Sequence, residues 1–462
     1  MAKKFRIESD TLGTKKVLSD KLWGAQTQRS LENFKIGKEK MPIEVIIAIG
    51  YQKKAATMTN MQLGKMDKKL GSAIIKTCDE IINLKLIEHF PLSIWQTGSG
   101  TQTNMNTNEV IANRAIQILK GKLGSKNPIH PNDHVNMSQS SNDVFPTVMH
   151  ISSILAINKN LIPAVDLLHQ ELLKKERQFK KIIKIGRTHT QDATPLSLGQ
   201  EFSGYKEQIH NNKKRLLLAM EEIYFLAQGG TAIGTGINAP KNFDTKFCNN
   251  LSKIIKLKFK PSKNKFEAIA AHDAILNLSS VLNTLAVSLF KISNDLRFLS
   301  SGPRAGLSEI TLPINEPGSS IMPGKTNPTQ IEALSMVCAQ VMGNNSSISL
   351  SASQGHFELN AFKPIIIYNL LQSINLLGDS INSFTKKCLK NIKVNKKKLN
   401  ENIKNSLMLV TALSPYIGYD NATKIAKKAF KENISLRDAT KKSGLIDIRK
   451  FDKIVDPKKL IK

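Results

Sequence analysis

The segment GSSIMPGKTNP, from Gly318 to Pro328, is the part of the sequence best equipped for chemistry, because it places hydroxyls, a cation and an amide between prolines. Proline cannot continue a helix, whereas Gly318 and Gly324 can adopt positive φ and let backbone N–H groups approach a ligand. Four side chains would add donors that suit carboxylate oxygens: Ser319, Ser320, Lys325 and Asn327. The segment therefore predicts a loop that closes over an anion.

Five further polar blocks follow one another along the chain: SGTQTNMN at 99–106, HPND at 130–133, SQSSND at 138–143, GRTHTQDATP at 186–195 and GGTAIGTG at 229–236. Together with the loop, these blocks resemble the class II fumarases, the iron-independent, tetrameric branch of the fumarase/aspartase superfamily. The resemblance implies a mainly α, three-domain fold with a central bundle of long helices. It also implies the reversible hydration of fumarate to (S)-malate, a step of the tricarboxylic acid cycle, without a metal or other cofactor.

The resemblance assigns the catalytic roles as well. It implies that Ser319 is the base that removes a carbon-bound proton, and that His189 works with a bound water on the hydroxyl, oriented by Glu332. A serine hydroxyl is a poor base unless neighbouring donors stabilise its alkoxide, and Lys325 and the loop amides are the candidates. An isolated serine or histidine would be read as a turn or core residue, so the surrounding motifs carry these assignments.

Dehydrating malate requires removing a proton from a very weak carbon acid, so the site must stabilise an aci-carboxylate intermediate with extra negative charge. Preorganised donors do this best, each worth about 3 kcal/mol in comparable oxyanion sites. The residues expected to hold the two carboxylates are short and polar: Ser99, Gly100, Thr101, Ser140, Ser141, Asn142, Thr188, Ser320, Lys325 and Asn327. Their number favours a small dicarboxylate as the substrate.

By the same resemblance, His130, Asn132 and Asp133 belong to a second, outer anion site. A metal cluster is the other reading of this block, but no further His or Glu at helical spacing completes a ligand set. The block departs from the family pattern at His134, where relatives have an acidic residue, and ahead of it at 126–128, where they often have a basic one. Inside the loop, Thr326 replaces a commoner valine of similar shape.

Other functions remain as alternatives. Aspartate ammonia-lyase, of the same superfamily, resembles this chain with glutamine in place of His189, so the histidine favours hydration. Argininosuccinate and adenylosuccinate lyases carry bulkier residues at the Gly324 position. Lens structural proteins of the superfamily are non-catalytic, and the presence of Ser319 and His189 argues against that use.

Composition bounds the remaining classes. The chain has 462 residues, 40% hydrophobic, and a net charge of +30, which raises the question of a nucleic-acid partner. The lysines are spread along the chain and aromatic residues make up only 6%, so we predict no nucleic-acid surface. The positive field would instead speed the arrival of a dicarboxylate.

Cellular location is predicted from the cysteines and the N-terminus. The four cysteines are far apart, which favours reduced thiols. The N-terminus lacks the apolar core of a signal peptide, and no uninterrupted apolar run reaches membrane-spanning length. We therefore expect a cytoplasmic protein without a membrane partner.

Apolar periodicity predicts long helices. Between Ser262 and Ser301 there is no proline or glycine, and apolar residues from Ile275 to Leu299 recur in steps of three and four. Similar stripes occur over 148–173, where Pro163 should introduce a kink, and over 331–341. Strand signals are sparse apart from Phe5 to Ile7. We predict an N-terminal domain (1–140), a central helical bundle (141–395) and a C-terminal domain (396–462). The resemblance to the family implies a homotetramer whose active sites are each shared among three subunits.

Overall fold

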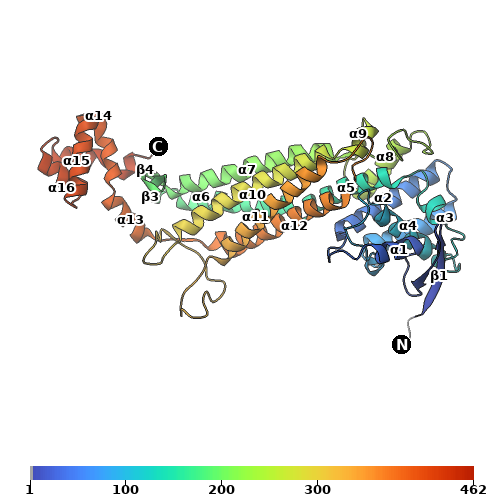
Figure 1. Ribbon diagram of the computed structural model, residues 1–462. Helices are drawn as coiled ribbons and strands as arrows, with labels where there is room; N and C mark the ends of the chain where they lie inside the picture. Colours follow the sequence, from blue (N-terminus) through green and yellow to red (C-terminus); the bar gives the residue numbers. More distant parts are fainter. Residues whose placement is uncertain (1–3, 462) are drawn as a thin grey trace. The chain divides into compact units, whose positions relative to one another are not determined.

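The computed structural model describes residues 4–461, and this part of the chain is mainly helical with four two-stranded sheets (Figure 1). The prediction of a mainly α fold built on long bundled helices is confirmed. The strands are β1 (Phe5–Asp10), β2 (Gly13–Leu18), β3 (Ile183–Thr188), β4 (Gln191–Ser197), β5 (Phe225–Leu226), β6 (Lys260–Pro261), β7 (Ile310–Thr311) and β8 (Lys393–Val394).

The helices follow in chain order. They are α1 (Ala25–Asn33), α2 (Ile43–Gln62), α3 (Lys68–Ile82), α4 (Thr101–Ile118), α5 (Ser141–Ala156), α6 (Ile162–Phe179), α7 (Leu198–Ile223), α8 (Phe243–Ile255), α9 (Lys265–Ala270), α10 (Asp273–Leu299), α11 (Thr329–Ala352), α12 (Lys363–Lys387), α13 (Lys396–Asn405), α14 (Ser414–Ile417), α15 (Tyr419–Lys431), α16 (Leu436–Ser443) and α17 (Ile448–Ile454). Short 3₁₀ or π turns are η1 (Ile87–His89), η2 (Pro131–Val135), η3 (Ile157–Leu161), η4 (Leu389–Asn391), η5 (Leu407–Leu413) and η6 (Pro457–Lys459).

Contacts divide the chain into two compact units. The first unit comprises residues 1–163, 214–286 and 338–378, and the second comprises 164–213, 287–337 and 379–462. The boundaries fall inside the helices α6, α7, α10, α11 and α12. The three sequence domains, with boundaries near 140 and 395, stay a prediction, since a division by contacts is a different criterion.

The predicted apolar seam forms the buried stripe of α10. Its eight residues are at most 5% exposed: Ile275, Leu278, Leu282, Leu285, Leu289, Ile292, Leu296 and Leu299. The helix begins at Asp273, later than the sequence suggested, because the short helix α9 ends at Ala270 and an extended residue, Ala271, follows it. The stripe from Ile331 to Val341 is likewise buried on α11.

Pro163 marks the expected irregularity in the helix that follows the 138–143 block. Regular α-helix gives way to the π turn η3 just before it, and α6 then carries the chain onward. Proline has no N–H to donate to the preceding turn, so a local change of hydrogen bonding there is the physical consequence.

Two helical stretches are long and apolar enough to cross a membrane by length and composition, Ser141–Phe179 and Asp273–Leu299. The sequence expectation concerned uninterrupted apolar runs, whereas this criterion averages hydropathy over a window that can include charged residues, so it does not test that expectation. Core helices of soluble proteins pass the same test, and the buried seam of α10 is the kind of stripe that such helices carry.

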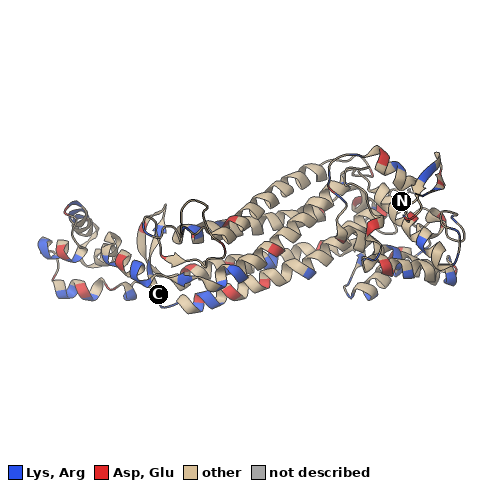
Figure 2. Ribbon diagram, turned by 90° about the horizontal axis from the view of Figure 1, so that it is seen from below, with Lys and Arg blue, Asp and Glu red and all other residues tan. Residues whose placement is uncertain are grey.

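Charge and thiols agree with the sequence reading. Lys and Arg are scattered along many helices with Asp and Glu among them (Figure 2). The four cysteines are free and buried, and burial raises the pKa of the Cys78 thiol to about 12, which makes its thiolate scarce.

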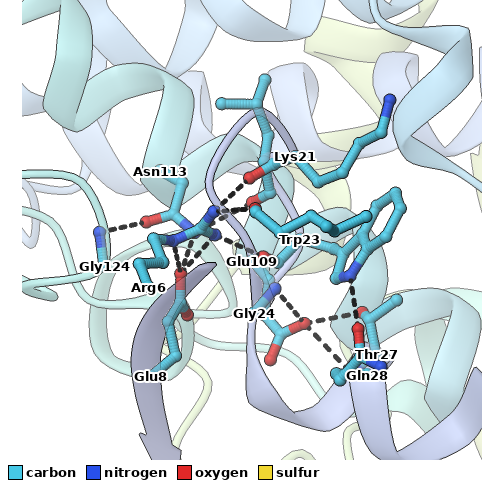
Figure 3. A network of polar contacts seen from close by, with 12 residues as sticks. Arg6, Glu8, Lys21, Trp23, Gly24, Thr27, Gln28, Glu109, Asn113 and Gly124 are labelled. Carbon is cyan, nitrogen blue, oxygen red and sulfur yellow. Dashed lines mark hydrogen bonds and ion pairs between the residues drawn. The ribbon is translucent and has the colours of Figure 1, made fainter. Parts of the chain in front are cut away.

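The start of α1 is held by a carboxylate from a distant helix (Figure 3). Gly24 precedes α1 and offers no side-chain cap. Instead, the buried carboxylate of Glu109, on α4, accepts hydrogen bonds from the backbone N–H groups of Gly24, Gln26 and Thr27, at 2.8–3.1 Å, and from the Thr27 hydroxyl at 2.6 Å. It therefore satisfies amides that would be left unpaired at a helix start.

We expect the substitution Glu109→Gln to lower the free energy of unfolding by about 2 kcal/mol, because an NH2 group would replace one acceptor oxygen and face N–H donors. Urea unfolding at constant protein concentration measures the change. Glu221→Gln, at an exposed position on α7, is the matched control and should leave the midpoint unchanged. Equal midpoints for both variants would contradict the capping role.

Candidate active site

Ser99, Gly100 and Thr101 lie at the amino end of α4. Gly100 precedes the helix with φ +77°, and a Cβ there would lie 2.3 Å from the ring of Phe145, so only glycine fits. The hydroxyls of Ser99 and Thr101 are 2.9 Å apart. Backbone N–H groups without intrahelical partners and the helix dipole both favour an anion at this point.

The block at 138–143 begins α5 and is tied to the glycine-rich block at 229–236. Ser140 caps the helix in a capping box with Asp143. The second oxygen of Asp143 accepts the N–H groups of Gly229, at 2.9 Å, and Thr231, at 3.0 Å. Burial raises the pKa of Asp143 to about 6, against the effect of these bonds.

Two amide contacts complete the arrangement around Ser141 and Asn142. Asn142 donates to the carbonyl of Ala232 at 2.8 Å. Asn104, on α4, donates to the Ser141 hydroxyl oxygen at 2.9 Å. The structure thus brings the 99–106, 138–143 and 229–236 blocks together inside the first unit.

The residues expected at an outer anion site form the π turn η2 and its start. His130 Nδ1 accepts the backbone N–H groups of Asn132 and Asp133 at 3.3 and 3.2 Å. Asp133 Oδ2 lies 3.2 Å from the same nitrogen, but Nδ1 cannot both accept these bonds and donate to a carboxylate. Because two backbone N–H groups donate to Nδ1, this nitrogen is the acceptor of the ring and Nε2 is its donor. His134 accepts the N–H of His130 at 2.9 Å, so it completes the turn.

Thr188 and His189 lie at the tip of the β3–β4 hairpin, in the second unit. Thr188 pairs with Gln191, so His189 and Thr190 form a two-residue turn, with φ of +54° and +60°. Both φ values are positive, as in a type I′ turn, where Asn or Gly is the usual choice. Sequence reasoning missed this hairpin because the turn lacks that signal, and it leaves the His189 side chain exposed.

A buried carboxylate anchors the base of this hairpin. Glu309, 1% exposed, pairs with Arg187 at 2.6 Å and with Lys184 at 3.1 Å, both on β3. Asn402 adds a hydrogen bond to Glu309 at 3.2 Å. Burial alone would raise the pKa of Glu309, but Arg187 and Lys184 outweigh it and leave that pKa below its ordinary value. A cavity of about 830 Å³ beside the hairpin is lined in part by Arg187 and Thr188.

The predicted anion loop is an exposed ring that closes on itself. Gly318 packs so tightly that a Cβ would lie 2.2 Å from the carbonyl oxygen of Lys325. Asn327 donates to the carbonyl of Gly318 at 2.6 Å, and Lys325 donates to the Asn327 side chain at 2.7 Å. Ser319 Oγ accepts the backbone N–H groups of residues 321 and 322 at 3.3 and 2.9 Å. These amides are donors of the kind that an alkoxide needs, whereas Lys325 contacts Asn327 instead.

The pairing of His189 with Glu332 stays a prediction. Within residues 4–461, the His189 side chain makes no hydrogen bond or ion pair, and Glu332 lies in the first turn of α11. The predicted residues also divide between the units: the 99–101, 130–133 and 140–142 groups belong to the first, and Thr188, His189, the loop residues and Glu332 to the second.

Comparison with known proteins identifies the family. A family model described as a lyase matches residues 13–343, and one described as the fumarase C C-terminus matches residues 409–462. The chain is 56% identical over 456 residues to a class II fumarate hydratase of Brucella suis, with 99% of this chain and 98% of that protein covered. The chain belongs to the class II fumarase family.

Other members of the family agree in sequence and in fold. A fumarate hydratase of Rhizopus oryzae, named as mitochondrial, is 57% identical over 460 residues, which cover 99% of this chain and 93% of that protein. The crystal structure of a class II fumarase from Schistosoma mansoni superposes with a TM-score of 0.97 at 45% identity and covers 98% of both chains.

Sequence reasoning on this fumarase-family chain missed the residues that hold the site in place. Asn104 stands inside a quoted block, so its amide could have been singled out. Glu309 has no motif around it, and only the burial of a lone carboxylate next to strand β7 marks it in the structure.

We expect Glu309→Gln to lower the free energy of unfolding by about 3 kcal/mol at pH 7, since it leaves Arg187 without this counter-charge and Lys184 with Glu201 alone. Because the pKa of Glu309 in the folded protein is lowered, this contribution is fully present above the ordinary pKa of 4.5 and is lost as pH falls through the lowered folded pKa. Urea unfolding at pH 7 and pH 4 should show a smaller difference in the free energy of unfolding between the variant and the parent protein at pH 4. The exposed pair of Glu432 and Lys442 provides the control, Glu432→Gln, with little change at either pH. A gap that widens in acid would contradict this assignment.

Proposed function

We propose that this protein catalyses the reversible hydration of fumarate to (S)-malate without a metal. The full-length similarity to fumarate hydratases carries the proposal. The predicted hydratase function and lyase class are confirmed by this similarity and by the match to the lyase family model. The relatives reported above bear the fumarate hydratase name, so the aspartase alternative is not favoured. The presence of His189, in place of the glutamine expected for an ammonia-lyase, points the same way.

In this proposal Ser319 removes the proton beside a carboxylate of malate. Two loop amides already donate to its oxygen, so they would stabilise the alkoxide that makes it a base. Lys325 and Asn327 would bind a substrate carboxylate as the loop closes, and Ser320 would add a hydroxyl.

His189 acts on the oxygen that leaves or attacks. At the tip of a hairpin whose base is fixed by Glu309, its imidazole would exchange a proton with a bound water. Glu332 would orient it in the complete site. The amino ends of α4 and α5, with Ser99 to Thr101 and Ser140 to Asn142, would hold the carboxylates by N–H and hydroxyl donors.

We further propose a homotetramer in which each active site draws residues from three subunits. The long helices leave apolar side chains in solvent, with Val287 on α10 and Met336 and Leu350 on α11 between 51% and 68% exposed. Helices with such faces are stabilised when a partner covers them. The cytoplasm is the proposed compartment, and the outer turn around His130 is the proposed second anion site.

Initial rates with malate, fumarate and aspartate, each with and without a chelator, test the reaction. We expect interconversion of malate and fumarate, followed at 240 nm and unchanged by chelator, with no ammonia from aspartate. Ammonia release without malate turnover would overturn the proposal, and loss of hydration in chelator would overturn its metal-free form.

Mixed tetramers test the sharing of residues between subunits. We expect Ser319→Ala and His189→Asn proteins, each impaired, to recover activity when they are refolded together, because some sites in a mixed tetramer then contain both intact residues. Each variant refolded alone is the control. Failure to recover in tetramers shown by mass spectrometry to be mixed would place both residues in one subunit.

A further inference from the structure

Lys53, in the middle of α2, is a fully buried lysine in the first unit. Its ammonium donates to the side-chain oxygens of Asn136 and Gln139, each at 3.0 Å, so its partners in the described part of the chain are amides rather than carboxylates. Burial lowers the pKa of Lys53 to about 7, although attraction to Asp143 offsets part of that effect. A buried cation with neutral partners is costly, so its retention calls for a role beyond packing.

Lys53 and nearby backbone carbonyls together set which way the neighbouring amides point. The NH2 group of Asn136 donates to the carbonyl of Gln139 at 3.2 Å, and that of Gln139 donates to the carbonyls of Val135 and Met137 at 3.1 and 3.0 Å. Asparagine and glutamine can present either an oxygen or an NH2 group, whereas an ammonium can only donate. Asn136 and Gln139 must therefore turn their oxygens toward Lys53. Even a neutral amine keeps two N–H groups, enough for both bonds.

The choice made at Asn136 passes on to Ser141. Because Asn136 Oδ1 is an acceptor, Asn104 and Asn108 turn their NH2 groups toward it, at 3.2 and 3.3 Å. The NH2 group of Asn104 also donates to Ser141 Oγ at 2.9 Å. The Ser141 oxygen is thus used as an acceptor, and its hydrogen is free to be donated elsewhere.

A second branch links the Gln139 oxygen to a buried carboxylate. Gln52 donates to the oxygens of both Gln139, at 2.9 Å, and Gln228, at 2.7 Å. Gln228 in turn donates to Asp143 at 3.0 Å. Since the ionised Asp143 can only accept, a donor-only group and an acceptor-only group stand at the two ends of one chain of amides.

The amides hold this direction at a cost. The side-chain oxygens of Gln52, Asn104 and Asn108 are buried without a hydrogen-bond partner among the described residues. Turning Asn104 over would place its oxygen against the oxygen of Asn136, which Lys53 keeps in place. The unpaired oxygens are therefore what a fixed polarity predicts.

We propose that Lys53 is a positioning residue that, on the oxygen side of Asn136 and Gln139, reinforces the polarity that backbone carbonyls set on their NH2 side, and so leaves the Ser141 hydroxyl hydrogen free to bind a substrate carboxylate. The inference rests on the proposed function, in which Ser141 contacts the dicarboxylate. Lys53 itself contacts only the amides, so it acts through Asn136 and Asn104.

A double-mutant cycle on the full-length protein tests this route. Lys53→Met, Ser141→Ala and the double variant are compared by calorimetric binding of succinate and by KM and kcat for fumarate. We expect each single change to weaken succinate binding and raise KM about tenfold, with kcat within about threefold of the parent. The double variant should bind succinate about as well as the single variant with the lower affinity, because both changes remove the same hydrogen bond. A residue needed only for structure would give losses that multiply.

The neighbouring Lys54, partly exposed and paired with Asp79, supplies the control, and Lys54→Met should stay within twofold of the parent. If Lys53→Met does not fold, Lys53→Gln enters the same cycle, since its amide keeps polar contacts but does not dictate their direction. Multiplying losses, or unchanged binding in Ser141→Ala, would overturn the proposal. If the losses in succinate binding are non-additive but the protein does not hydrate fumarate, the coupling of Lys53 to Ser141 stands and the proposed reaction is overturned.

Discussion

Most of the site geometry depends on buried charges that are satisfied by donors from loops and element ends. Asp143 ties the start of α5 to the glycine-rich block, Glu309 holds the base of the β3–β4 hairpin, and Glu109 caps α1. Each charge is taken out of water, and each is compensated by several hydrogen bonds or by cations. A partly formed version of any of these sets would leave a buried charge exposed to a low-dielectric interior, so the loops are held in one arrangement.

In the proposed function, such donors would suit a dianion. A site that grips two carboxylates with lysines alone would bind tightly without favouring the aci-carboxylate over the substrate, whereas short hydroxyls, amides and helix ends can be aimed where charge develops. The buried charges behind these donors carry the cost of orientation before substrate arrives. The donors come from sequence blocks rich in Gly, Ser, Thr and Asn, which can be recognised in the sequence. The buried charges that hold these blocks in place cannot be recognised in the same way.

The helices and the motif blocks could be predicted from the sequence, whereas the buried charges that hold the loops could not. Apolar periodicity located the stripes of α10 and α11, and the signature loop and blocks led to the right family. Periodicity could not show that α9 and α10 are separate, since no proline or glycine marks the break at Ala271. Lys53 looks like any lysine in a helix, because its partners Asn136 and Gln139 lie 83 and 86 residues away and only folding brings them near.

The hairpin shows why local rules fail at such a site. Residues other than glycine at positive φ each cost on the order of 1 kcal/mol or more, and the turn places His189 and Thr190 there in succession. Asn-Gly would relax the turn but would remove the one imidazole at its tip. The turn persists because its strands are held from below: Lys184 and Arg187, on the same strand, are locked to Glu309, which is itself buried. The ion pairs at the base of the hairpin therefore stabilise a turn that is strained at its tip. A prediction from the turn residues alone gives a loop, because the stabilising residues lie outside the turn.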